Sequence, residues 1–178
     1  MMTFTAKRYA LGTLLAVAVA TAGCAGTRHE DATASAVNFI VVRHAEKAPA
    51  GEDPGLTAAG LARAERLADA LAARPVVAAY ATDYRRTRQT AAPTARRHGL
   101  GIDIYDARRP ADGFARELRE RHPQGDVLVV GHSNTAPDIA AALCGCPVAA
   151  MAESEYGRQM VVRVGTDGSA TLDVSGDP

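Results

Sequence analysis

The sequence of 178 residues contains no tryptophan, and only 4% of its residues are aromatic. It also lacks a charge of one dominant sign, because twenty basic and twenty acidic side chains give a formal net charge of zero. A chain without an overall positive field lacks the electrostatic signature of nucleic-acid binding, so we expect no nucleic-acid partner. The length suits one domain rather than two. A composition of 47% hydrophobic and 22% charged residues is typical of a globular domain.

No hydrophobic run is long enough for a comfortable membrane span. The apolar residues 9–22 form a short run that follows Lys7 and Arg8. A charged start before a short apolar run predicts a secretory signal over residues 1–23, and therefore export of the protein.

Cysteine is scarce, and the three that occur fall in two places. Cys24 ends a Thr-Ala-Gly-Cys stretch that resembles the cleavage box of bacterial lipoproteins, although threonine stands where leucine is usual. We predict cleavage before Cys24 and acylation of its thiol, which would anchor the protein at a membrane. An ordinary signal peptide, or an uncleaved anchor, is the alternative. The small polar residues 24–36 predict a flexible tether, and residues 37–178 form the domain.

Cys144 and Cys146 flank a single glycine. Export would allow them to oxidise, but a disulfide across one intervening residue is strained, so we predict buried free thiols. The pair lacks the further ligands of a zinc site, and we expect no metal and no other cofactor.

Short apolar runs alternate with helical patterns through the domain. The apolar runs predict strands at residues 38–42, 76–81, 102–105 and 127–130. The helical periodicity predicts helices at residues 57–73, 86–98, 114–121 and 137–143. Two further apolar runs, 160–164 and 170–174, flank a Gly-Thr-Asp-Gly-Ser turn and predict a hairpin. We therefore predict a single-domain α/β protein of three layers, α/β/α, with a mostly parallel central sheet and the C-terminal hairpin at its edge.

Polar side chains follow each of the four predicted parallel strands. Arg43 and His44 follow the first, Arg86 the second, Asp106 the third and His132 the fourth. The carboxyl ends of parallel strands share one edge of a sheet, where ligands bind. The sequence therefore predicts a site that brings together two histidines, two arginines and a carboxylate.

These residue types suit phosphoryl chemistry. Arginine presents a planar fork of donors that matches phosphate oxygens and stays charged. A neutral imidazole can attack phosphorus through one ring nitrogen when an acceptor holds the other. Arg86 lies at the start of a predicted helix, where free N–H groups also favour an anion. Asp106 is placed to give a proton to the leaving oxygen.

Three motifs carry a resemblance to a known family. They are Val-Val-Arg-His-Ala-Glu-Lys at 41–47, Thr-Asp-Tyr-Arg-Arg-Thr-Arg-Gln-Thr-Ala at 82–91 and Val-Val-Gly-His-Ser-Asn-Thr at 129–135. In this order they resemble the motifs of the histidine phosphatase superfamily, the phosphoglycerate-mutase-like group, in its small single-domain type. The resemblance runs from about residue 38 to residue 164.

The resemblance implies roles for individual residues. His44 would be the nucleophile that becomes phosphorylated. Arg43, Arg86 and His132 would form the phosphate pocket, and Asn134 would contribute its backbone N–H or its amide.

The proton donor departs from the family pattern. Asp106 stands where many members carry a glutamate, and its side chain is one methylene shorter. Asp103 points to the opposite face of the strand and is a weaker candidate. Glu46 and Glu155 are the alternatives.

The resulting hypothesis is an exported phosphatase that hydrolyses a small phosphomonoester through a phosphohistidine intermediate. A lipoprotein that binds a phosphorylated ligand without turnover is an alternative from another class. A phosphoglycerate mutase is a further alternative, although the short segment between Arg86 and Val127 leaves little room for a lid. A phosphohistidine phosphatase would ordinarily be cytoplasmic, and a metalloenzyme built on His44 and His132 would need a third ligand. The sequence indicates neither the physiological substrate nor the oligomeric state.

Overall fold

A computed structural model describes residues 1–3 and 35–176 of the chain. Apart from residues 1–3, which belong to no helix or strand, the predicted signal sequence lies outside the described residues. So do Cys24 and all but the last two residues of the predicted tether. Within the described residues, no helix is both long enough and apolar enough to cross a membrane.

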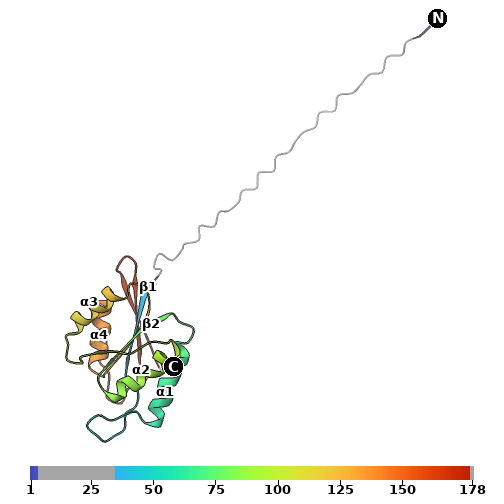
Figure 1. Ribbon diagram of the computed structural model, residues 1–178. Coiled ribbons are helices and arrows are strands. Elements are labelled where there is room, and N and C mark those ends of the chain that lie inside the picture. The colour runs from blue at the N-terminus through green and yellow to red at the C-terminus, as the bar shows by residue number, and fades with distance from the viewer. Residues whose placement is uncertain (4–34, 177–178) are drawn as a thin grey trace. The chain divides into compact units, whose positions relative to one another are not determined.

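The domain contains six strands and four helices in alternation (Figure 1). The strands are β1 (Ser35–Arg43), β2 (Val76–Thr82), β3 (Asp103–Tyr105), β4 (Gly125–Gly131), β5 (Gln159–Gly165) and β6 (Ala170–Ser175). The helices are α1 (Ala58–Ala70), α2 (Arg85–Arg97), α3 (Ala111–Arg121) and α4 (Thr135–Cys144). All four helices and all six strands were predicted, with boundaries that differ by three residues or fewer.

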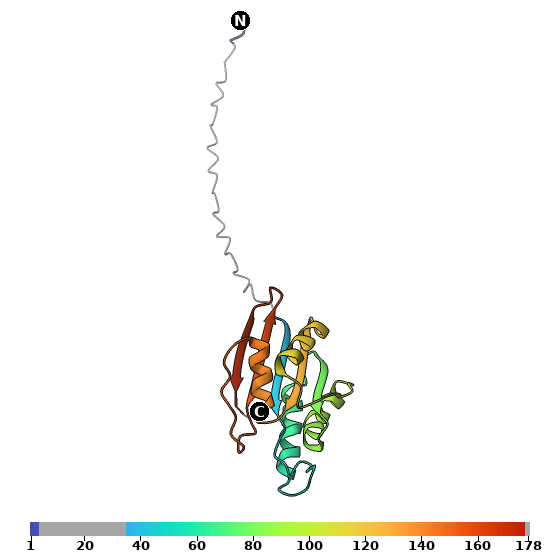
Figure 2. The same ribbon diagram turned by 90° about the vertical axis from the view of Figure 1, so that its left-hand side faces the viewer.

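All six strands form one sheet in the order β3-β2-β4-β1-β5-β6. The first four strands in this order pair in parallel, whereas β5 runs antiparallel to β1 and β6 antiparallel to β5. The hairpin β5–β6 therefore closes one edge of the sheet (Figure 2), as predicted.

Helices cover both faces of the sheet, which confirms the three-layer prediction (Figure 1). Side chains of a strand alternate between its faces, and β1 shows this clearly. Val41 packs in the cluster that includes Phe114 of α3 and Leu143 of α4. Its neighbour Val42 packs in the other cluster, with Leu67 of α1. Strands that are buried on both faces have continuous apolar sequences, and for this reason they could be predicted from the sequence.

Strand β1 begins two residues before the predicted start of the domain. Ser35 pairs with Gly165 of β5, so Ser35 and Ala36 belong to the sheet and not to the tether. Pairing with β5 of the hairpin thus extends β1 beyond the apolar run from which this strand was predicted.

The prediction of free thiols is wrong, because Cys144 and Cys146 form a disulfide. Their Cα atoms lie 5.2 Å apart, within the range of about 4.4–6.8 Å that disulfides ordinarily span. Gly145 ends α4 in the left-handed conformation, with φ of 65°, and turns the chain so that the two cysteines face each other.

The segment after β1 is held by the start of α1. The hydroxyl of Thr57 accepts a hydrogen bond from the N–H of Gly60 at 3.1 Å, and the N–H of Thr57 donates to the carbonyl of Glu46 at 2.9 Å. A Cβ atom on Gly60 would lie 2.3 Å from the same carbonyl oxygen, so the glycine permits this close approach. These contacts fix the backbone that carries His44.

Candidate active site

A cavity of about 360 Å³ lies where the parallel strands end. It is lined by Arg43, His44, Lys47, Tyr84, Arg86, Ala107, Arg108, His132, Ser133, Asn134, Thr135 and Glu153. Five of the six predicted site residues are among them, and Asp106 is not.

His44 lies at the floor of the cavity and is only 2% exposed. Its main-chain N–H donates to the carbonyl of Gly131 at 2.9 Å, which ties the end of β1 to the end of β4. Its Nδ1 lies 2.8 Å from the carbonyl oxygen of Ala45 and donates to it. The lone pair of His44 is therefore on Nε2, which is the arrangement that a nucleophilic imidazole needs.

Burial lowers the pKa of His44 to about 4. This value already includes an opposing effect of the hydrogen bond to the Ala45 carbonyl and smaller lowering effects of the nearby His132, Arg43 and Arg86. At neutral pH the imidazole is therefore uncharged, with a free lone pair.

His132 follows β4, and a chain of hydroxyl groups holds its ring. Its Nε2 lies 2.9 Å from Oγ1 of Thr82, which lies 3.0 Å from Oγ1 of Thr87. The Thr87 hydroxyl donates to a backbone carbonyl, that of Thr82 or that of Tyr84, each at 2.8 Å. Each hydroxyl has one proton, so Thr82 donates to Thr87 and accepts from Nε2–H of His132. The buried threonines thus set the tautomer of His132.

The two histidine rings make an edge-to-face contact at the cavity, with their centroids 5.4 Å apart and their planes at 69°. Burial, together with the charges of Arg86 and Arg43, lowers the pKa of His132 to about 4. Both rings are therefore neutral in the free protein at neutral pH. An anion bound between them would favour protonation of His132, because an opposite charge stabilises the imidazolium.

Arg43 ends β1 with its side chain buried, and the segment 152–156 holds it. Its Nη1 donates to the carbonyls of Ala152, Glu153 and Glu155 at 2.9–3.0 Å. Its Nη2 donates to Oε2 of Glu153 at 2.9 Å, and its guanidinium lies over the ring of Tyr156 at 4.4 Å. We call residues 152–156 the Arg43 clamp, because they fix one edge of the guanidinium.

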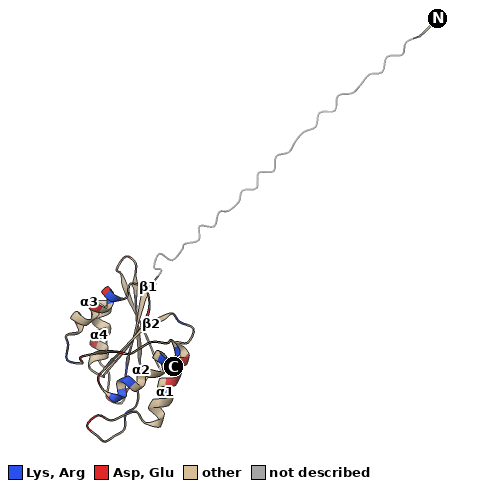
Figure 3. Ribbon diagram, viewed as in Figure 1, with Lys and Arg blue, Asp and Glu red and all other residues tan. Residues whose placement is uncertain are grey.

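Arg86 approaches the cavity from the first turn of α2. Its guanidinium lies over the ring of Tyr84 at 4.4 Å, and its Nη1 is 3.7 Å from a carboxylate oxygen of Asp53. Figure 3 shows the basic residues that α2 presents.

The Nε atoms of Arg43 and Arg86 are both buried, and neither has a hydrogen-bond partner. Only two other buried side-chain nitrogen or oxygen atoms among the described residues share this condition. An unsatisfied buried donor costs about 1–3 kcal/mol, more for a charged group, and native structures contain few. Both arginines also line the cavity, where their positive charges favour an anion.

Asn134 lies at the cavity as the residue that precedes α4. Its side chain makes no capping hydrogen bond, so its amide remains available to a ligand. Free N–H groups of the first turn of a helix favour an anion, and this helix begins at Thr135.

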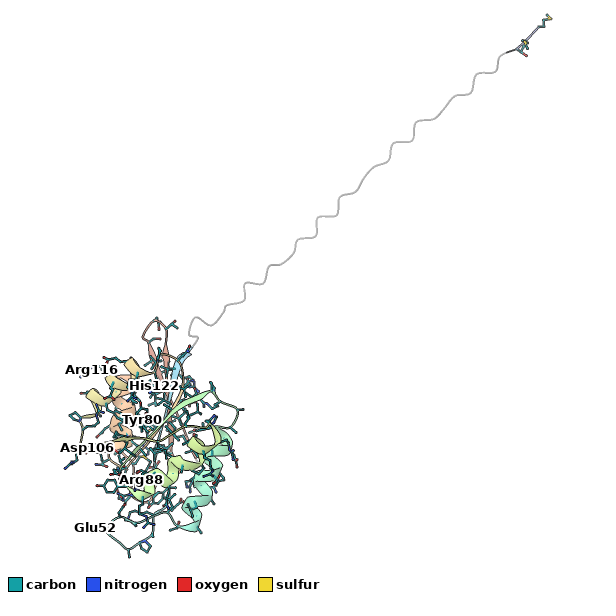
Figure 4. The ribbon with its side chains drawn as sticks, in the orientation of Figure 1. Glu52, Tyr80, Arg88, Asp106, Arg116 and His122 are labelled. Carbon is teal, nitrogen blue, oxygen red and sulfur yellow. A yellow bond between two sulfur atoms is a disulfide. The ribbon has the colours of Figure 1, made fainter. Side chains whose placement is uncertain are left out.

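Asp106, labelled in Figure 4, does not line this cavity but lines a neighbouring one, which shares Tyr84, Ala107 and Arg108 with it. Its carboxylate accepts hydrogen bonds from the main-chain N–H, Nε and Nη2 of Arg108 at 2.9–3.2 Å. These bonds close a tight turn after β3 and lower the pKa of Asp106. The turn instead places Ala107 and Arg108 against the cavity.

The other predicted proton donors also lie outside the cavity lining. Glu46 pairs with Arg63 at 2.7 Å, and Glu155 pairs with Arg158 at 2.6 Å. Glu153 is the carboxylate that does line the cavity. Sequence reasoning missed it, because it lies in an irregular loop with no strand end or motif to mark it.

The cavity is cationic, since Lys47 and Arg108 also line it beside Arg43 and Arg86. In the described part of the chain, no group of three or more His, Cys, Asp or Glu side chains is arranged to hold a metal ion.

The comparison with known families agrees with this geometry. The model of the histidine phosphatase superfamily (branch 1) matches residues 39–112, which include Arg43, His44 and Arg86. His132 lies beyond the matched residues, and the fold brings it to the same cavity. Over residues 39–112 the chain is therefore similar to the histidine phosphatase superfamily.

Similar proteins include an uncharacterised protein of Mycobacterium tuberculosis (strain ATCC 25618 / H37Rv). It is 40% identical over 98 residues, which cover 44% of this chain and 48% of the relative. The chain thus covers about half the length of the curated relatives it matches.

Several solved structures of phosphatases share the fold. The protein histidine phosphatase SixA, solved with tungstate, has a TM-score of 0.65 and 17% identity, and the match covers 78% of this chain and 96% of SixA. A mycobacterial glucosyl-3-phosphoglycerate phosphatase has a TM-score of 0.62 and 17% identity, with 79% and 99% covered. A putative SixA of Agrobacterium tumefaciens has a TM-score of 0.57 and 22% identity, with 80% and 97% covered.

Proposed function

We propose that the protein is a phosphatase that hydrolyses a small phosphomonoester through a phosphohistidine on His44, without a metal ion. The observation that carries the proposal is the pair of arginines, Arg43 and Arg86, that line the cavity beside a neutral imidazole. Phosphate bound between the two arginines would lie with its phosphorus near Nε2 of His44. The SixA structure that shares the fold contains tungstate, an oxyanion, which is consistent with such a site.

The reaction would proceed in two steps. Nε2 of His44 attacks phosphorus while the bond from phosphorus to the leaving oxygen breaks, and Nδ1–H remains on the Ala45 carbonyl. Arg43, Arg86 and His132 stabilise the charge on the transferring phosphoryl group, and each such donor contributes about 10²–10³ in rate. Water then attacks the phosphohistidine and releases inorganic phosphate.

The direct test is hydrolysis of 4-nitrophenyl phosphate from pH 4.5 to 7.5 in the presence of a chelator. We expect the wild type to turn over and His44→Asn to lose at least about 10³-fold in kcat/KM. His98→Asn is the matched control, because this histidine bonds the Leu71 carbonyl outside the cavity. Loss of activity with the chelator would contradict the metal-free mechanism. A wild type that binds phosphate tightly and never turns over would instead be a phosphate-binding protein.

We also propose that the protein is exported and anchored to a membrane through an acylated Cys24. The charged start, the short apolar run and the Thr-Ala-Gly-Cys stretch support this proposal. In a bacterial host fed a labelled fatty acid, the wild type should take up label and fractionate with membranes. Cys24→Ala should do neither, and equal labelling of both would contradict acylation at this thiol.

A further inference from the structure

The carboxylate of Glu153 bridges the two strand ends that carry the histidines. One oxygen accepts a hydrogen bond from Nη2 of Arg43 at 2.9 Å, and the other accepts one from the hydroxyl of Ser133. Arg43 directly precedes His44, and Ser133 directly follows His132. Among the described residues that line the cavity, Glu153 supplies the only carboxylate.

Glu153 also lies on the solvent side of the site. Its side chain is 79% exposed, whereas His44 is 2% exposed at the cavity floor. In phosphoryl transfer the attacking and leaving atoms are roughly in line through phosphorus. A leaving oxygen opposite the buried Nε2 of His44 would therefore face the mouth of the cavity, where this carboxylate lies.

We propose that Glu153 is the catalytic residue that gives a proton to the leaving oxygen and then takes one from the attacking water. This inference rests on the proposed phosphatase function. It assigns to a loop between α4 and β5 the task that the sequence assigned to Asp106 at the end of β3.

The proton balance closes over the two steps. As the bond from Nε2 of His44 to phosphorus forms and the ester bond breaks, the carboxyl of Glu153 protonates the leaving oxygen and becomes a carboxylate. As a water oxygen bonds to phosphorus and the bond to Nε2 breaks, the carboxylate takes the proton of that water. The products are an alcohol and inorganic phosphate, which takes the proton from Glu153 as it leaves, so that the protein returns to its initial, ionised state.

The first proton would arrive with the substrate. Hydrogen bonding from Ser133 and the charge of Arg43 lower the pKa of Glu153, so the free protein holds it ionised at neutral pH. A phosphomonoester monoanion carries the required proton on its own oxygen and can pass it to Glu153. Because the second pKa of a phosphomonoester is about 6, kcat/KM should decrease above that pH.

A purely structural role must be separated from a catalytic one, because Glu153 also contributes to the Arg43 clamp. The separation comes from phosphate esters whose leaving groups range from nitrophenols to simple alcohols. A nitrophenolate leaves without a proton, whereas an alkoxide requires one. Loss of a proton donor therefore depends on the leaving group, and loss of a phosphate contact does not.

The experiment compares the wild type with Glu153→Gln, Glu153→Asp and Asp106→Asn. For alkyl phosphates we expect kcat/KM of Glu153→Gln to decrease about 10²–10⁴-fold, with a much smaller decrease for nitrophenyl phosphates. With nitrophenyl phosphates, Glu153→Gln should release a burst of one equivalent of nitrophenolate per protein and then turn over slowly, because the attack of water lacks its base. Glu153→Asp should recover part of the alkyl phosphate activity, and Asp106→Asn should resemble the wild type.

Equal loss by Glu153→Gln on all leaving groups would overturn the inference, because the residue would then only position Arg43. A leaving-group dependence confined to Asp106→Asn would also overturn it, in favour of that carboxylate. A wild type inactive on every ester would instead refute the proposed function itself, and the inference with it.

Discussion

The buried, neutral His44 makes the stability of the protein sensitive to mild acid. Burial lowers its pKa from 6.5 to about 4, so the folded state resists a proton that the unfolded chain accepts. Between these two pH values the unfolded state binds more protons, and stability therefore falls as the pH is lowered. With these two pKa values, the contribution lost by His44 alone between pH 7.5 and 5.5 is about 1.3 kcal/mol, and by pH 4 it is about 3 kcal/mol.

The assay is urea unfolding followed by circular dichroism at pH 7.5 and pH 5.5, for the wild type and for His44→Asn. The asparagine amide can still donate to the Ala45 carbonyl, but it does not titrate. We expect the wild type to lose about 1 kcal/mol more than the variant between the two pH values. Equal losses by the two proteins would refute the account of a buried, neutral nucleophile.

Three further predictions concern the groups around the histidines. Thr82→Val removes the acceptor for Nε2–H of His132. We expect thermal unfolding to show a loss of about 1–3 kcal/mol in the free energy of unfolding, and kcat/KM to fall at least about tenfold. Wild-type values of both quantities would contradict the hydroxyl chain. Arg86→Lys replaces a planar fork by a point charge, so the rise in Tm that inorganic phosphate gives the wild type should shrink strongly, and an equal rise would argue against a direct contact. Gly60→Ala places a Cβ atom 2.3 Å from the Glu46 carbonyl oxygen, and calorimetry should record a loss of about 1–3 kcal/mol in the free energy of unfolding. An unchanged free energy would mean that α1 moves aside without cost.

Much of the fold could be predicted, because its strands are buried on both faces and alternate with amphipathic helices. The buried strands are continuous apolar runs, such as the Val-Leu-Val-Val of β4. Parallel pairing then brings the ends of β1 and β4 together, and the register places Arg43 opposite Gly131. The positions of His44 and His132 follow from this geometry.

Other features depend on loop geometry that periodicity does not reveal. Asp106 follows a strand end as the others do, but its carboxylate accepts a hydrogen bond from the N–H of Arg108 two residues on and lines a neighbouring cavity instead. Glu153 reaches the cavity only because the carbonyls around it hold Arg43. The disulfide depends on the left-handed conformation of Gly145, which the spacing of the cysteines alone does not indicate.

The central claim is that His44 becomes phosphorylated, and a rapid-quench experiment with a nitrophenyl phosphate tests it most directly. Glu153→Gln is the best protein for this purpose, since slow water attack should let the intermediate accumulate. Mass spectrometry of alkali-quenched peptides should then find one phosphoryl group on His44, labile to acid, and none in His44→Asn. If the protein turns over but its peptides carry phosphate on another residue, the account is contradicted. Peptides that carry no phosphate when the burst is complete would contradict it as well.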